Sequence, residues 1–173
     1  GDVTEVISTS NSSWPGKIVM DSDGTTCVVN GDTPADAGIY ERQSGSSWTL
    51  AHSVLSVSSY YSRGGCAISY DGTMVLTGAY NYNPGSASNS GRAYLYQYSG
   101  GSWSLTKTYD NPDSSPAASD FWGYGLAIAK DAKNRIAIGM PGDDTAGSNY
   151  GSFHTYTNAI PDYISFDTYN KLT

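Results

Sequence analysis

Residues 67–78 read AISYDGTMVLTG, and the prediction of the fold rests on this segment. Two short apolar runs flank an Asp-Gly pair, and this is the pattern of a β-hairpin because Gly supplies the positive φ of a tight turn. The same order recurs upstream in residues 18–31 (IVMDSDGTTCVVNG). It recurs downstream in residues 127–139 (AIAKDAKNRIAIG), where DAKN at 131–134 takes the place of Asp-Gly and Asn134 can adopt the left-handed conformation. Hairpins that return along a chain indicate stacked units that cannot bury their apolar faces alone.

A second hairpin follows each of the first ones after a polar loop. In the middle repeat it reads GRAYLYQYSGGSWSL over residues 91–105, and its upstream counterpart is GIYERQSGSSWTL over residues 38–50. Each repeat therefore reads as four antiparallel strands, and four-stranded units of this size are typical of β-propeller blades. The run 93–98 is apolar at almost every position, which predicts burial on both of its faces.

We therefore expect an all-β chain with about three propeller-type blades, at residues 16–52, 63–107 and 121–157. Residues 1–15 would form a lead-in strand or linker, and residues 158–173 a tail that is an extra strand or a linker. Three blades do not close a ring, since propellers typically have four to eight. A longer chain, a ring completed by other subunits and an open sheet stack all remain open.

The third repeat resembles the FG-GAP repeat, which forms the blades of integrin α-subunit propellers and occurs in viral and secreted surface proteins. The resemblance rests on FWGYGLAIA (121–129), IAIGMP (136–141) and GSFHTY (151–156). The second repeat matches through GAY at 78–80 and the first, more weakly, through GDT at 31–33. The resemblance covers roughly residues 16–157, and it implies a propeller on a cell or virion surface.

Calcium-binding blades of the FG-GAP kind carry alternating Asp and Asn ligands in their first hairpin. Here Asp21 and Asp23 are retained, but neighbouring ligand positions hold Val19 and Cys27. A calcium ion takes six to eight oxygen ligands, so we expect no cofactor there. Asp143 and Asp144 are a second, equally weak candidate pair.

The composition of the chain restricts the classes of partner that we expect. The net charge is −7 and only 14% of residues are charged, so a nucleic-acid partner is not expected. No apolar run approaches the ~20 residues that cross a bilayer, so membrane insertion is not expected either. Low charge with 15 Tyr favours an extracellular or virion-surface location. Cys27 and Cys66 are read as two buried free thiols, with a cross-blade disulfide as the alternative.

Strand alternation places the long loops of all blades at one end. Loops on a rigid scaffold commonly carry binding residues, and aromatic rings beside carboxylates suit a glycan. The alternative is that these side chains only support the turns. The predicted ligand-binding residues are Tyr80, Tyr82, Asn83, Trp122, Asp143, Asp144 and Tyr150.

These observations predict a non-enzymatic recognition or structural module. It would bind a glycan or protein on a cell or virion surface, as a homo-oligomer or together with further blades. No catalytic residue is predicted, because the two histidines, His52 and His154, belong to no recognisable catalytic motif. The rival hypothesis is a carbohydrate-active enzyme or accessory domain that uses the acidic loop residues.

Overall fold

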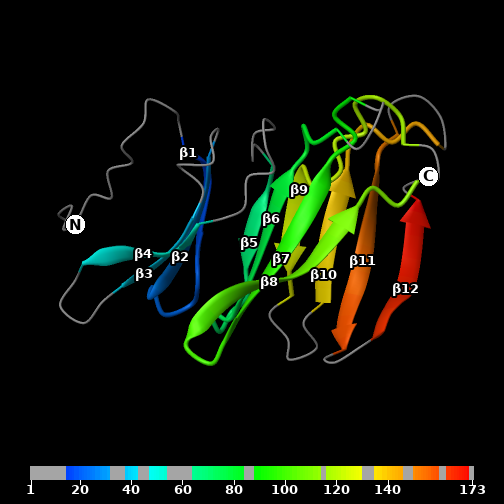
Figure 1. The fold of residues 1–173 in the computed structure, drawn as a ribbon. Helices are drawn as coiled ribbons and strands as arrows, with labels where there is room; N and C mark the ends of the chain where they lie inside the picture. Colours follow the sequence, from blue (N-terminus) through cyan, green and yellow to red (C-terminus); the bar gives the residue numbers. More distant parts are fainter. Residues whose placement is uncertain are drawn as a thin grey trace.

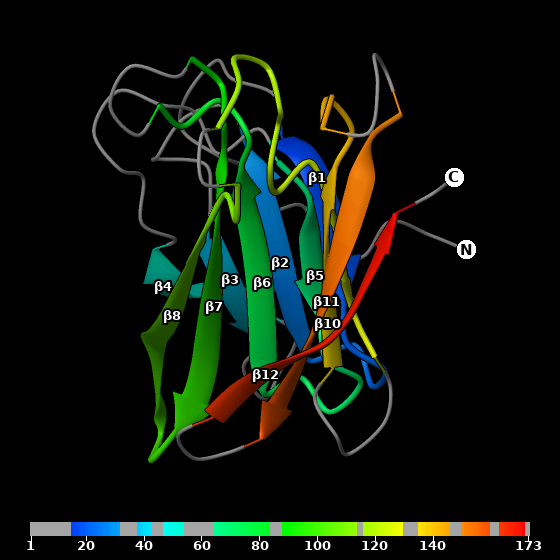
Figure 2. The same ribbon diagram turned by 90° about the vertical axis from the view of Figure 1, so that its right-hand side faces the viewer.

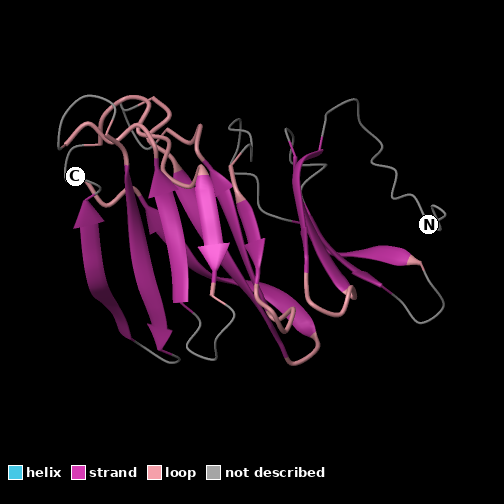
Figure 3. Ribbon diagram, turned by 180° about the vertical axis from the view of Figure 1, so that it is seen from behind, coloured by secondary structure: helices cyan, strands magenta, loops and turns pink. Residues whose placement is uncertain are grey.

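The computed structural model describes residues 15–31, 38–42, 47–53, 64–83, 88–113, 116–129, 135–145, 150–159 and 163–171. This part of the chain consists of strands and loops without a helix, which confirms the all-β prediction (Figure 3). The strands are β1 (Pro15–Met20), β2 (Thr26–Gly31), β3 (Gly38–Arg42), β4 (Trp48–Ser53), β5 (Cys66–Ile68), β6 (Met74–Ala79), β7 (Arg92–Ser99), β8 (Ser102–Asp110), β9 (Gly125–Ile128), β10 (Arg135–Met140), β11 (Ser152–Ala159) and β12 (Tyr163–Lys171).

The strands form three antiparallel sheets of four consecutive strands each. Sheet 1 contains β1 to β4, sheet 2 contains β5 to β8 and sheet 3 contains β9 to β12. The three sheets stand in a row with sheet 2 in the middle (Figures 1 and 2). Strand β5 contacts β1 and β2, and strand β9 contacts β5 and β6, so successive sheets meet mainly through their first strands. Strand β12 comes from the C-terminal tail and pairs with β11 of its own sheet.

The first two strands of every sheet are paired in the same register. Val19 pairs with Val28, Ala67 with Leu76, and Ala127 with Ala137. This register defines which positions are equivalent in the three sheets. It corrects the alignment of the short glycine motifs by one residue, because Asn30 and not Gly31 stands where sheets 2 and 3 have Gly78 and Gly139.

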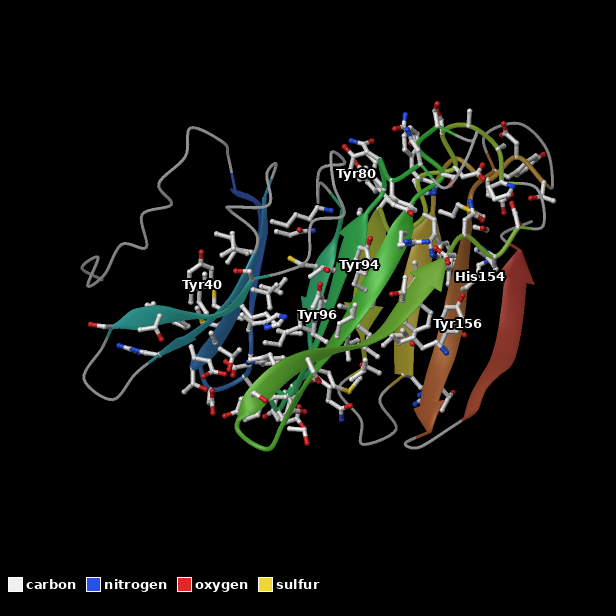
Figure 4. All side chains as sticks on the ribbon, viewed as in Figure 1. Tyr40, Tyr80, Tyr94, Tyr96, His154 and Tyr156 are labelled. Atoms are coloured by element: carbon white, nitrogen blue, oxygen red, sulfur yellow. The ribbon has the colours of Figure 1, made fainter. Side chains whose placement is uncertain are left out.

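Strand β7 is buried on both faces over residues 93–96, which confirms the prediction for that part of the run 93–98. The prediction is wrong for the end of the run, because Gln97 is half-buried and Tyr98 is 39% exposed. Ala93 and Leu95 belong to the core between sheets 2 and 3, whereas Tyr94 and Tyr96 belong to the core between sheets 1 and 2. Successive side chains of a strand point to opposite faces, so both faces of a middle sheet must be apolar. Figure 4 shows Tyr94 and Tyr96 in this central region.

Glycine allows the sheets to approach closely near their first strands. A Cβ on Gly78 would lie 2.0 Å from the carbonyl oxygen of Gly123. The amides of Gly65 and Gly123 donate hydrogen bonds to the oxygens of Gly123 and Gly139, over 3.0 and 3.1 Å. Asn30 replaces glycine in sheet 1, and its side-chain nitrogen donates to the oxygens of Gly64, Gly65 and Gly78 over 3.0, 3.0 and 3.2 Å.

The Asp-Gly turns have the backbone conformation that the sequence predicted. Gly24 and Gly72 have φ angles of 74° and 70°. The corresponding turn of the third repeat, including Asn134, lies outside the described residues. Cys27 and Cys66 are separate buried thiols, and burial raises the pKa of Cys66 to about 11.

Candidate functional site

The long connections of sheets 2 and 3 gather at one end of the molecule, at the top of Figures 1 and 2. We call the described parts of these connections, residues 80–83, 88–91, 111–113, 116–124, 141–145 and 150–151, the loop end. Backbone hydrogen bonds connect its segments, from Phe121 to Asn89 (3.0 Å), from Trp122 to Ser90 (3.0 Å) and from Gly142 to Asp120 (3.1 Å). The loops therefore form one platform that spans two sheets.

An aromatic cluster lies on this platform. The ring of Tyr80 lies 5.6 Å from that of Phe121 and 5.2 Å from that of Tyr124, at interplanar angles of 77° and 56°. Tyr80 is labelled at this end in Figure 4. The amino group of Lys17 lies 5.1 Å from the centre of the Tyr124 ring. Tyr124 remains 49% exposed, so the cluster offers an aromatic surface to solvent.

Tyr82 and Asn83 are held within the loop between β6 and β7. The guanidinium carbon of Arg92 lies 4.0 Å from the centre of the Tyr82 ring, and its Nε forms an ion pair with Asp110. The Asn83 side-chain oxygen accepts a hydrogen bond from the amide of Asn89. Both predicted site residues thus help to order the loop, and both are only half-buried.

Three carboxylates approach one another deeper in the platform, at Asp113, Asp120 and Asp143. Asp120 is 1% exposed, and its Oδ2 accepts hydrogen bonds from the Asn111 amide group (2.9 Å) and from the amide of Ala117 (2.8 Å). Burial raises the pKa of Asp120, and the charges of the two other carboxylates act in the same direction. Asp143 is 2% exposed and accepts hydrogen bonds from Thr145.

The remaining predicted residues divide between core and surface. Trp122 is completely buried, its Nε1 donates to the carbonyl oxygen of Tyr109 over 3.1 Å, and its ring lies 5.0 Å from that of His154. It therefore presents no ring face to a ligand in this structure. Tyr150 is 58% exposed and Asp144 is also exposed. In the described loop end, the exposed aromatic and acidic side chains are those of Tyr124, Tyr150 and Asp144, and Tyr80 is half-buried beside Tyr124.

Sequence reasoning did not select Phe121, Tyr124, Lys17 or Arg92. Phe121 and Tyr124 lie within residues 121–129, the segment on which the FG-GAP resemblance rests. Lys17 belongs to β1 of sheet 1 and reaches the carbonyl oxygen of Tyr124 over 3.5 Å. A contact between residues that far apart in sequence left no signal in the chain.

The weak metal candidates Asp21 and Asp23 lie at the opposite end, in the turn between β1 and β2. Both carboxylates accept hydrogen bonds from the amide and hydroxyl of Thr25. The Thr25 hydroxyl is also the main reason that the pKa of Asp23 is lowered. Among the described residues, no three acidic, cysteine or histidine side chains are grouped so that they could hold a metal ion.

Neither a known protein family nor a curated protein matches this sequence. The described part of the chain also has no helix that is long and apolar enough to cross a membrane.

Proposed function

We propose that this chain is a non-enzymatic recognition or structural module on an extracellular or virion surface. Its three sheets act as propeller-type blades of the FG-GAP kind, and its loop end binds a glycan or a protein. The observation that carries this proposal is the half-exposed Tyr124, which stands with Tyr80 and Phe121 on loops that hydrogen bonds fix to one another.

A fixed aromatic surface favours a glycan as the first ligand to test. Sugar rings stack on aromatic side chains, and an ordered platform loses little conformational entropy on binding. Asp144 and Thr145, both exposed, add hydrogen-bonding groups to the loop end. A protein partner would use the same aromatic surface, because Tyr is enriched at the centre of protein interfaces.

The carboxylates of the loop end support binding better than catalysis. Glycoside hydrolysis needs two carboxyl groups that flank a sugar. Asp120 and Asp143 are 1% and 2% exposed and accept hydrogen bonds from their own loops. These hydrogen bonds connect residues within the loops, and the burial of both carboxylates leaves little surface for a substrate.

A glycan array probed with the labelled protein tests the proposal. Wild-type protein should bind a defined group of glycans, and Tyr124→Ala and Tyr80→Ala should lose that binding. Tyr70→Ala is the matched control, since Tyr70 is 52% exposed but lies in the turn between β5 and β6. Binding that Tyr70→Ala abolishes and Tyr124→Ala preserves would contradict the site. Release of a shortened sugar would favour the rival enzymatic function.

A further inference from the structure

In its first strand, each outer face of the sheet row carries exposed counterparts of residues that are buried inside the row. In the first strands, Ile18 and Met20 are equivalent to Cys66 and Ile68 of sheet 2 and to Leu126 and Ile128 of sheet 3. The residues of sheets 2 and 3 pack on the preceding sheet. In the described part of the chain no sheet precedes sheet 1, and there Ile18 and Met20 are 59% and 52% exposed.

The residues on the opposite faces of the first strands pack on the following sheet instead of the preceding one. Val19 packs in the core between sheets 1 and 2, and its equivalent Ala67, 8% exposed, packs in the core between sheets 2 and 3. The next equivalent, Ala127, lies on the outer face of sheet 3 and is exposed. The equivalent faces of sheets 1 and 2 each pack against the next sheet, whereas no sheet of the described part of the chain packs on the outer face of sheet 3.

The two outer faces differ in the size of their exposed side chains. The outer face of sheet 3 contains a hollow of about 380 Å³ whose lining includes the small side chains of Ala127, Ala129 and Ala137. On the outer face of sheet 1, the side chains of Ile18, Met20 and Leu50 are all more than half exposed. Their neighbours on the same face, Cys27, Val29 and Tyr40, are buried in a cluster of their own. Large exposed apolar side chains grouped on one face mark interaction surfaces in soluble proteins.

The first strands of the three sheets also lie close to one another. Met20, Ile68 and Ile128 occupy equivalent positions, and all three line one cavity of about 470 Å³. This cavity lies at the end of the molecule opposite to the loop end, beside the turns that follow β1 and β5. Nearer the loop end, Lys17 of sheet 1 reaches Tyr124 beside sheet 3. First strands gathered around one axis are what a section of a propeller ring would have.

We propose that a second copy of this chain packs the outer face of its sheet 1 on the outer face of sheet 3, and that the reciprocal contact closes a six-bladed dimer. A head-to-tail contact builds a closed ring when its rotation permits. The described part of each copy contributes three sheets, so two copies would supply six, within the usual four to eight blades. The inference rests on the propeller-type arrangement in the proposed function but not on its ligand.

The first experiment measures mass in solution by light scattering and sedimentation. Wild-type protein should have twice the 18.3 kDa mass of the chain at micromolar concentration. Ile18→Lys should weaken the dimer about tenfold or more, because the charge would be buried at both contacts. Ala127→Glu should do the same from the other face. Leu105→Lys on β8, where Leu105 is 37% exposed, is the matched control and should stay dimeric.

A mixture of the Ile18→Lys and Ala127→Glu proteins distinguishes the head-to-tail contact from a symmetric one. In a mixed dimer one contact pairs the introduced lysine with the introduced glutamate, and the other contact is wild type, so mixing should restore the dimer. Circular dichroism of each variant alone should match wild type, because both substituted side chains are exposed. A monomeric wild type, a dimer that survives either substitution, or a mixture that stays monomeric would each overturn the proposal. Glycan binding by a monomer would leave the proposed function standing.

Discussion

Asp21 and Ser69 occupy the same position in two successive turns and accept the same pair of backbone hydrogen bonds. The Asp21 carboxylate accepts from the amides of Thr25 and Thr26, over 3.0 and 3.1 Å. The Ser69 hydroxyl accepts from the amides of Thr73 and Met74, over 3.1 and 2.9 Å. The two equivalent turns thus use different side chains for the same role, because either oxygen can accept hydrogen bonds from amides that the hairpin leaves unpaired.

Removing either acceptor should destabilise the protein. Ser69→Ala takes the acceptor from the amide of the buried Met74, so we expect a loss of about 1–3 kcal/mol in the free energy of unfolding. Asp21→Ala should cost less, because Asp21 is partly exposed and water can replace its oxygens. Asp21→Ser retains an acceptor and should remain within about 0.5 kcal/mol of wild type. Urea denaturation measures all three, and an equal loss in Asp21→Ser and Asp21→Ala would contradict this account.

Asn30 should tolerate loss of its side chain better than conversion to a carboxylate. Its amide group faces three carbonyl oxygens and is 1% exposed, so Asn30→Ala should cost about 1–3 kcal/mol. Asn30→Asp places a buried acceptor against those oxygens and should cost more. Its stability should recover as the pH falls, because the neutral acid can donate. Thermal unfolding at two pH values tests this order, and a more stable Asn30→Asp than Asn30→Ala at neutral pH would refute it.

Gly78 and Gly139 are equivalent positions that should respond differently to alanine. At Gly78 the new Cβ would lie 2.0 Å from the Gly123 oxygen, whereas at Gly139 the nearest atom lies at 3.5 Å. Overpacking of this kind typically costs about 1–3 kcal/mol or more, so Gly78→Ala should be strongly destabilised. The stability of a single copy of the chain should change little in Gly139→Ala. Similar denaturation midpoints for both variants would show that sheets 2 and 3 are not packed this closely.

His154 should make stability depend on pH. It is 4% exposed, and burial lowers its pKa, so the folded state favours the neutral imidazole. Its contribution is fully present above the ordinary pKa and is lost as the pH falls through the lowered one. Between about pH 7 and pH 5 the melting temperature should fall less in His154→Gln than in wild type. Parallel slopes for the two proteins would assign the pH dependence to other groups.

Asp120 should contribute in the opposite direction. Its raised pKa means that folding favours the protonated acid, so its contribution is present below the ordinary pKa and is lost as the pH rises. Asp120→Asn keeps an oxygen for the Asn111 and Ala117 donors without the buried charge. This variant should therefore be at least as stable as wild type at neutral pH in a denaturant titration. A clear loss of stability would show that the charge itself supports the loops.

Local patterns in the chain were sufficient to predict the strands and turns. Asp-Gly pairs indicated the hairpins because their backbone conformation fits such turns, and the apolar run 93–98 predicted a strand buried on both faces. Tyr80 and the exposed Tyr150 also lie in the loops where strand alternation placed them. These features depend on residues that are neighbours in the sequence, so they can be predicted from composition and spacing.

Contacts between sheets, in contrast, control which loop residues face solvent and which support the core. Trp122 and Tyr124 are two residues apart in one motif, yet the first is fully buried and the second is half-exposed. Their difference depends on Tyr109 and His154 for the one and on Tyr80 and Lys17 for the other. Likewise, Asn30 resembles any polar strand residue until the glycines of the next sheet approach it. The repeated four-stranded unit follows from local backbone preferences in the sequence, whereas packing between distant units created the surface that they share.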